Sequence, residues 1–358
     1  MKHSSKYVGL DVHQATTVAV VQDDAGRVIA RSVLPTEESA LVEFVRGMRG
    51  AIQVAFEEGT QAQWLHDLLV PVVARVIVCD RRGEPRRGHK GDWHDAAELA
   101  DSLRAGRLRA VYHGSPHRAA LKELARAYRN LVEDSTRVMS RLKALFRARG
   151  IATAGRGVYD AARRAEWLGK LGDAGVRLRA ATLYAELEVL HALRPTAKAA
   201  LVAEARRDPG WAVLRTIPFL GPVRVALLLA TLQTPWRFRT KRQLWKYAGL
   251  AVVTRTTAEY ALDARGRPVK RRRPPMTRGL NQNHNHVVKE VFKGAATVAA
   301  VRAGEFRDLY RVLVARGMRE ELARLTLTRK LAALTLRLWK TGERYDAKKL
   351  TSYAVPAR

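Results

Sequence analysis

The first 103 residues contain five short β-rich runs and three helical patterns, and their order restricts the fold more than any other feature. The β-rich runs cover residues 7–12, 16–22, 28–34, 52–56 and 76–79. The helical patterns cover residues 37–48, 61–70 and 93–103. Turn-forming residues at 23–26 join the second and third runs, which favours an antiparallel meander. Three consecutive strands followed by helix-separated strands predict a mixed α/β sheet.

A long apolar repeat follows this region. Ser115 and Pro116 are typical of a helix start. Apolar residues then recur at alternating intervals of three and four, with one polar break, at Leu121, Leu124, Tyr128, Leu131, Ser135, Val138, Leu142 and Leu145. The repeat predicts a long helix with a coiled-coil seam, ended by Gly150 and Gly155. Two interpretations stay open, a hairpin within the chain and dimerisation through the seam, because heptads alone do not fix the partner.

A second helical stretch, at residues 161–206, would supply the other arm of such a hairpin, with interruptions expected near Gly172 and Pro195. From Pro209 onward the chain is mainly helical, except for residues 254–278, where arginine, lysine and proline predict an extended basic loop. We therefore predict three domains, at residues 1–112, 113–207 and 208–358.

The charge of the chain indicates its partner. The 358 residues include 65 Lys and Arg against 34 Asp and Glu, a net charge of +31, and such self-repulsion points to nucleic acid. No apolar run reaches the ~18 residues that span a bilayer, so no membrane is expected. The N-terminal sequence lacks the features of a signal peptide, which predicts a cytoplasmic protein. Cys79 is the only cysteine, so a metal site must use oxygen or histidine ligands.

Acidic residues fall at the ends of the predicted elements in the first domain. Asp11 and Glu57 end β-rich runs, and Asp92 and Asp95 are three apart on one face of a helical pattern. In the order of an RNase H-like sheet these ends meet, which gives an oxygen-rich pocket suited to Mg²⁺. Two such ions would activate a nucleophile and stabilise the leaving oxygen at a phosphodiester. Glu58 remains an alternative to Glu57, and each acid alone could instead be a structural cap or a solvated charge.

Three sequence blocks carry these acids, and through them the chain resembles a known family. The blocks are Gly9-Leu10-Asp11-Val12-His13, Phe56-Glu57-Glu58-Gly59 and Lys90-Gly91-Asp92-Trp93-His94-Asp95-Ala96. They are similar to the Asp-Glu-Asp-Asp set of the bridge-RNA-guided transposases of insertion-sequence family 110 and their relatives, the pilin-gene invertases. The resemblance implies a RuvC-like domain with the four acids, an α-helical coiled-coil middle and a mainly α C-terminal transposase domain.

C-terminal blocks extend the resemblance over nearly the whole chain. They are Ile217-Pro218-Phe219-Leu220-Gly221-Pro222, Tyr247-Ala248-Gly249-Leu250 and Thr277-Arg278-Gly279-Leu280-Asn281. Family members usually have glycine where Phe219 stands. The family also implies a nucleophilic serine seven or eight residues after Gly249, where this chain has Thr256 and Thr257. Either a threonine hydroxyl replaces the serine, or the chain retains only binding.

The resemblance further implies a recombinase that acts on donor and target DNA, with Mg²⁺ at the four acids and a structured noncoding RNA as guide. It also implies a homodimer or homotetramer in which domains act across subunits. The predicted nucleic-acid contacts are Arg255, Lys270, Arg271, Arg272, Arg273 and Arg278. Two other functions remain open: a structure-selective nuclease that uses the same acids with water, and a noncatalytic nucleic-acid-binding derivative.

Overall fold

The chain forms two compact units, residues 1–117 and 118–358. The computed structural model describes residues 4–80, 91–114, 118–255, 260–264, 267–270 and 276–349. None of the helices in these ranges combines the length and apolar composition that a bilayer crossing requires. Each unit has its own hydrophobic core, so each is described separately.

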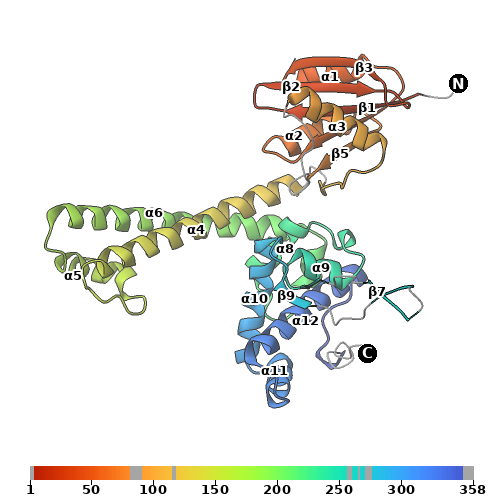
Figure 1. Ribbon diagram of the computed structural model, residues 1–358. Coiled ribbons are helices and arrows are strands. Elements are labelled where there is room, and N and C mark those ends of the chain that lie inside the picture. The colour runs from red at the N-terminus through yellow and green to blue at the C-terminus, as the bar shows by residue number, and fades with distance from the viewer. Residues whose placement is uncertain are drawn as a thin grey trace. The chain divides into compact units, whose positions relative to one another are not determined.

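The first unit is built on one five-stranded sheet, and helices lie against both of its faces (Figure 1). Its elements are β1 (Ser5–Val12), β2 (Thr16–Gln22), β3 (Val28–Pro35), α1 (Glu38–Arg46), β4 (Ala51–Glu57), α2 (Ala62–Leu69), β5 (Arg75–Cys79) and α3 (Asp92–Arg104). The strand order is β3-β2-β1-β4-β5. β1 pairs antiparallel with β2 and parallel with β4, so β1 is the central strand. The predicted mixed α/β sheet is confirmed.

The two faces of the sheet bury different helices because side chains alternate along each strand. Val8 and Leu10 of β1 pack in the core formed with α1 and α2. Ala55 of β4 packs instead with Leu99 and Leu103 of α3. The residues of β1 that alternate with Val8 and Leu10 therefore face α3. This face of the sheet carries the candidate site.

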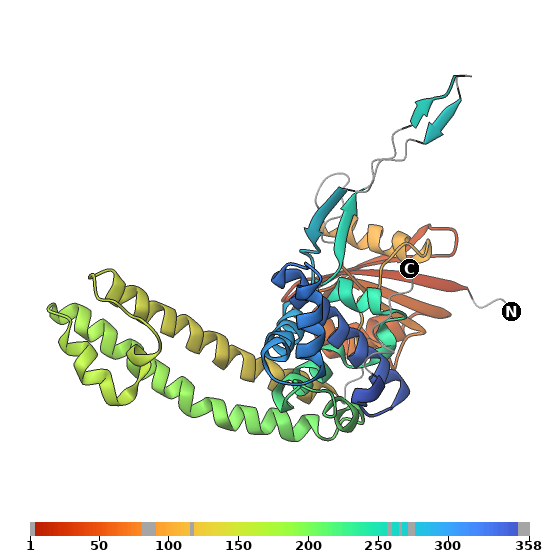
Figure 2. The same ribbon diagram turned by 90° about the horizontal axis from the view of Figure 1, so that it is seen from below.

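The second unit begins with a helical hairpin. α4 (Ala119–Arg147) and α6 (Ala174–Ala205) run side by side, joined through α5 (Arg164–Gly169) at the tip (Figures 1 and 2). Short 3-10 turns, η2 (Gly157–Tyr159) and η3 (Ala161–Arg163), lie in the same connection. Because Val138 and Leu142 of α4 pack with Leu183 of α6, the predicted seam is buried within the chain as an antiparallel hairpin. The predicted start at Ser115 and Pro116 lies outside the described residues.

The predicted break at Pro195 is wrong. α6 continues through Pro195, whereas the break at Gly172 is present between α5 and α6. A proline inside a helix costs about 3 kcal/mol because it removes one backbone hydrogen bond. Buried packing on both sides offsets this cost, since Leu187 contacts the hairpin core before the proline and Leu201 contacts the C-terminal core after it.

The C-terminal region packs its helices around one large core, to which the base of the hairpin also contributes through Leu121, Tyr128 and Leu201. The helices are α7 (Gly210–Leu214), α8 (Pro222–Leu232), α9 (Lys241–Tyr247), α10 (His286–Val301), α11 (Glu305–Ala315) and α12 (Glu320–Thr341), with 3-10 turns η4 (Pro235–Arg237) and η5 (Ala347–Lys349). The predicted helical character of this region is confirmed.

Short strands occupy much of the segment that was expected to be an irregular basic loop. β6 (Val252–Arg255) pairs with β9 (Met276–Leu280), and β7 (Tyr260–Leu262) pairs with β8 (Pro268–Lys270), both antiparallel. Figure 2 shows the two ribbons, one following the other. The prediction of a non-helical segment is therefore right for the described residues, but the prediction of irregular structure is wrong. Cross-strand hydrogen bonding compensates for the weak strand propensity of this proline- and arginine-containing sequence.

The turn before α8 has a backbone conformation that glycine favours, although a phenylalanine stands there. Phe219 has a φ of 66°, in the left-handed region. Its ring packs edge-on against Phe306, with 5.9 Å between centroids, and its carbonyl oxygen accepts a hydrogen bond from Arg224 at 2.8 Å. These contacts hold the strained residue, so the turn keeps its shape without the glycine.

Candidate functional site

Asp11 lies near the end of the central strand, on the face that α3 covers. Val8 and Leu10 point into the opposite core, so alternation places Gly9 and Asp11 on the α3 face. The Asp11 side chain is 22% exposed, so solvent can reach it although the residue belongs to the central strand.

Gly9 sets the distance between this strand and α3. A Cβ atom at Gly9 would lie 2.0 Å from the carbonyl oxygen of Ala96 and 2.6 Å from the backbone nitrogen of Ala100. No side chain fits in that space. The glycine therefore lets the helix backbone lie directly on the strand, next to Asp11.

α3 brings two more acids to the same place. Asp92 is its first residue and Asp95 lies one turn later, while Ala96 and Leu99 bury the helix against the sheet. Acidic side chains in a first helical turn are stabilised by the helix dipole, so these positions also suit the helix itself. The consequence is a carboxylate pair held above the end of β1.

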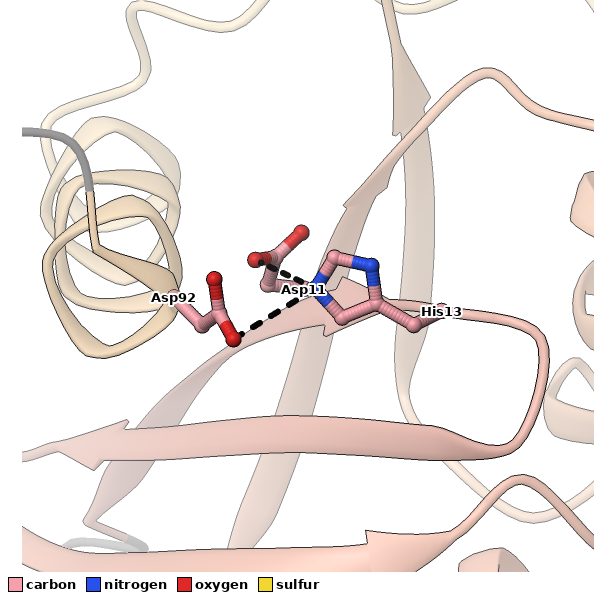
Figure 3. A group of neighbouring side chains, drawn as sticks. All are labelled: Asp11, His13 and Asp92. Atoms are coloured by element: carbon pink, nitrogen blue, oxygen red, sulfur yellow. Dashed lines mark ion pairs between the residues drawn. The ribbon is translucent and has the colours of Figure 1, made fainter.

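His13 lies between the carboxylates of two of these acids, as Figure 3 shows. Its Nε2 is 3.3 Å from Oδ2 of Asp11 and 3.7 Å from Oδ2 of Asp92. One ligand atom from each of the three residues lies within 4.8 Å of the others, the spacing of a metal-binding group. His13 is not among the site residues that the sequence predicts. The available signal was its position two residues after Asp11, just past the end of β1.

Burial and neighbouring charges change the acidity of Asp11. Burial raises the pKa of the Asp11 carboxyl, His13 lowers it, and the nearby carboxylates of Asp92 and Asp95 raise it again. The net direction is upward. Asp92 and Asp95 are therefore close enough to Asp11 to disfavour its negative charge, and a bound cation would relieve that repulsion.

Glu57 ends the strand beside Asp11. β1 and β4 are parallel with Leu10 opposite Phe56, so Asp11 and Glu57 follow at neighbouring strand ends. Because Ala55 packs on the α3 side, alternation places Glu57 on that side too. Both acids line a cavity of about 630 Å³ at this edge of the sheet.

Glu58 lines the same cavity, but its carboxylate makes a different contact. Nε2 of His113 lies 2.9 Å from Oε2 of Glu58, and Nδ1 lies 3.3 Å from Oε1 of Gln63. The His113 side chain is only 6% exposed and stacks on His66 at 5.0 Å between ring centroids. This arrangement ties Glu58 to a histidine pair, which sequence reasoning missed because nothing local links residues 58 and 113.

The predicted C-terminal site residues are only partly within the described chain. Thr256, Thr257, Arg271, Arg272 and Arg273 lie outside the described residues. The backbones of the other three basic residues lie on the ribbons: Arg255 on β6, Lys270 on β8 and Arg278 on β9. In the sequence the two threonines come after Arg255, the last residue of β6, and before Tyr260, the first residue of β7.

Comparison with protein families gives two matches. Residues 8–148 match a family described as transposase, the DEDD type of IS110, and this span includes all four candidate acids. Residues 212–311 match the transposase family IS116/IS110/IS902, and this span includes both β-ribbons. No curated protein matches the chain.

Proposed function

Because this chain belongs to the IS110 family of transposases, we propose that it exchanges strands between a donor and a target DNA, with four acids and a C-terminal hydroxyl as its catalytic groups. The acids are Asp11, Glu57, Asp92 and Asp95. The observation that carries the proposal is their position: two end neighbouring parallel strands, and two begin the helix packed on those strands.

The order of the sheet supports an RNase H-like, RuvC-like assignment for this domain. Three antiparallel strands, β1 to β3, are followed by β4 and β5 parallel to β1, with β1 in the centre. We further assign residues 1–112 to the catalytic domain, 113–207 to the coiled-coil segment and 208–358 to the transposase domain.

The residues at this site fit a magnesium ion. The acids offer carboxylate oxygens, which hard cations prefer. Burial, with the nearby carboxylates of Asp92 and Asp95, raises the pKa of Asp11, and a bound cation would favour its ionised form. Asp11, Glu57, Asp92 and Asp95 would hold the metal, and His13 would orient the carboxylate of Asp11. When bound, Mg²⁺ would offset the charge that develops on a phosphodiester under attack.

In the proposed reaction a threonine hydroxyl attacks the scissile phosphorus. A bond forms between the hydroxyl oxygen and phosphorus, the bond to one sugar oxygen breaks, and the proton of the hydroxyl passes to solvent or to the leaving oxygen. Because one ester replaces another, the DNA stays covalently attached to the protein and can be rejoined to a new partner. Hydrolysis, by contrast, would release a free phosphate end.

Nucleic acid would be bound by the basic residues of the C-terminal region. Contacts with phosphates are supported by a net charge of +31 and by basic residues on the ribbons, Arg255, Lys270 and Arg278. Arg271, Arg272 and Arg273 follow Lys270 in the sequence. A structured noncoding guide RNA, a cytoplasmic location and a dimeric or tetrameric assembly are part of the proposal. They come from the family resemblance.

The identity of the nucleophile is tested by comparing the native chain with Thr256→Ala, Thr257→Ala and the matching serine variants. We expect the native chain to join donor and target plasmids that carry the element's flanking DNA, and one alanine variant to lose this activity. The same variant should lose the covalent protein–DNA adduct seen on denaturing gels, and its serine counterpart should keep both.

Cleavage by the native chain without an adduct would contradict the threonine mechanism and favour a nuclease that uses water. If the native chain joins no plasmids and one serine variant does, the chain is a recombinase impaired at this position. If the native chain and every variant bind DNA but join no plasmids, the noncatalytic binding function is favoured.

The variants Glu57→Gln and Glu58→Gln distinguish the roles of the two neighbouring glutamates. Since Glu57 shares the α3 face and Glu58 is held by His113, we expect Glu57→Gln to reduce strand exchange about a hundredfold or more. Glu58→Gln should keep most of the activity, because glutamine can still accept a hydrogen bond from His113. Strand exchange at several Mg²⁺ concentrations measures both, and the opposite order would assign the role to Glu58.

A further inference from the structure

α6 has two apolar faces, and only one of them is covered by its own chain. Ala180, Leu183, Tyr184 and Leu187 are buried against α4 and α5. On the opposite side Leu178, Val189 and Leu193 are 69%, 58% and 51% exposed. A helix that is apolar on both sides is normally buried on both sides.

The exposed face is a continuous stripe, which we call the outer stripe. Its members recur at alternating intervals of four and three residues: Leu178, Thr182, Ala185, Val189, Ala192 and Thr196, all exposed. Leu193 lies at its edge. Thr182 donates its hydroxyl to the carbonyl oxygen of Leu178 at 3.0 Å, so that polar group is already satisfied within the helix. No charged residue interrupts the stripe, and its spacing is that of a coiled-coil seam.

Charged residues flank the outer stripe in a self-complementary pattern. At 100° per residue, Arg177 and Glu188 lie along one edge, and Arg179 and Glu186 lie along the other. On each edge the base comes first and the acid follows, so an antiparallel copy of the same helix brings each arginine opposite a glutamate. A parallel copy in register would place like charges together.

We propose that the outer stripe pairs antiparallel with the same stripe of a second copy of this chain. The apolar pattern sets the register, and the charged pattern agrees with it to within two residues. In an antiparallel coiled coil each a position of one helix pairs with a d position of the other. This register satisfies the rule, because it pairs Leu178 with the partner's Val189 and Thr182 with the partner's Ala185. In that register Arg179 reaches Glu186 of the partner subunit, and Arg177 reaches Glu188 of the partner subunit.

The ends of the stripe agree with this register. Leu193, the last large exposed residue of the stripe, falls opposite Ala174, the first residue of α6. Pro195 lies two residues further along α6. Arg177, Arg179 and Glu186 make no ion pair with another residue in the described ranges, whereas Glu188 is bonded to Arg164 at 3.0 Å and remains 66% exposed. Three of the four flanking charges thus have no competing ion pair.

The role of this dimer rests on the proposed function, since strand exchange between two DNAs requires more than one copy of the chain at the junction. The surface itself follows from α6. The paired segment covers fewer than three heptads, so we expect a concentration-dependent dimer in the absence of DNA.

Cysteine cross-linking tests the direction and register of the pair. Leu178→Cys and Val189→Cys are made separately in the full chain, where the native Cys79 is buried and does not compete. A mixture of the two variants should form a disulfide-linked dimer under mild oxidation. Each variant alone should not, because identical positions would lie roughly 16 Å apart along the axis. Cross-linking of each variant with itself would overturn the antiparallel register, and no cross-linking in any sample would overturn the pairing.

Sedimentation velocity without DNA tests the surface itself. Val189→Glu should weaken the dimer about tenfold or more, because it buries a charge in the seam, whereas the control His191→Glu adds the same charge off the stripe and should not. Arg179→Glu should weaken the dimer, and adding Glu186→Arg should restore it. A dimer unaffected by Val189→Glu, or a native chain that stays monomeric, would contradict the proposal. A native dimer that fails in strand exchange would instead contradict the proposed function.

Discussion

Asp11→Asn is expected to reduce DNA strand exchange about a thousandfold, the effect of losing several kcal/mol of charge stabilisation at the reacting phosphate. Asp11 lies on the central strand, and burial together with the nearby carboxylates of Asp92 and Asp95 raises the pKa of its carboxyl. An amide keeps the shape of the side chain and its contact with His13, but it removes the negative charge. The measurement is junction formation between donor and target plasmids, with Mg²⁺ varied.

Thermal unfolding is the control for this variant. The pKa of Asp11 is raised in the folded state, so ionising this group at neutral pH lowers the stability of the fold; that penalty is absent at pH values below its unfolded pKa and complete above its folded pKa. Asp11→Asn removes the penalty and should unfold at an equal or higher temperature than the native chain. Added Mg²⁺ should raise the Tm of the native chain more than that of the variant. Full strand exchange by a stably folded Asp11→Asn chain would refute the site.

Gly9→Val is expected to destabilise the first unit by about 3 kcal/mol or more, which is a large share of the stability of a domain. Its Cβ would lie 2.0 Å from the carbonyl oxygen of Ala96, and helix backbone atoms have no rotamer with which to move aside. α3 would have to lift from the sheet, taking Asp92 and Asp95 with it. Denaturant unfolding followed by circular dichroism measures the loss of stability, and strand exchange should fall with it.

A matched control exists in the same unit. Gly47 ends α1 with ordinary helical φ, and a Cβ there would be 3.4 Å from its nearest neighbour. Gly47→Ala should therefore leave stability almost unchanged or slightly higher. Equal stability of the Gly9→Val and native chains would show that α3 does not depend on this close approach.

The sequence predicted the first unit well because its elements have strong local signals. Alternating β-rich runs and turn residues located every strand of the sheet to within two residues, and the order of these strands indicated which ends would meet. Asp11 and Asp92 were selected for that reason, and the structure places them around one histidine. That these acids bind a metal remains a prediction.

Other features depend on contacts that no local pattern contains. The choice between Glu57 and Glu58 requires the side of the sheet on which each residue lies, which follows from the packing of Ala55 against α3. His113 meets Glu58 only in the folded chain. The break expected at Pro195 failed for a similar reason, because the local cost of the proline is outweighed by packing along the rest of α6.

The uninterrupted length of α6 has a consequence for DNA geometry. From the centre of the proposed pair to Leu201, where the C-terminal core begins, α6 rises roughly 26 Å at 1.5 Å per residue. Two antiparallel copies would hold their C-terminal cores roughly 52 Å apart along the rod, close to the length of about 15 base pairs of B-form DNA. A helix broken at Pro195 would not fix that spacing. The continuous α6 would therefore set the distance between the C-terminal cores of the two copies.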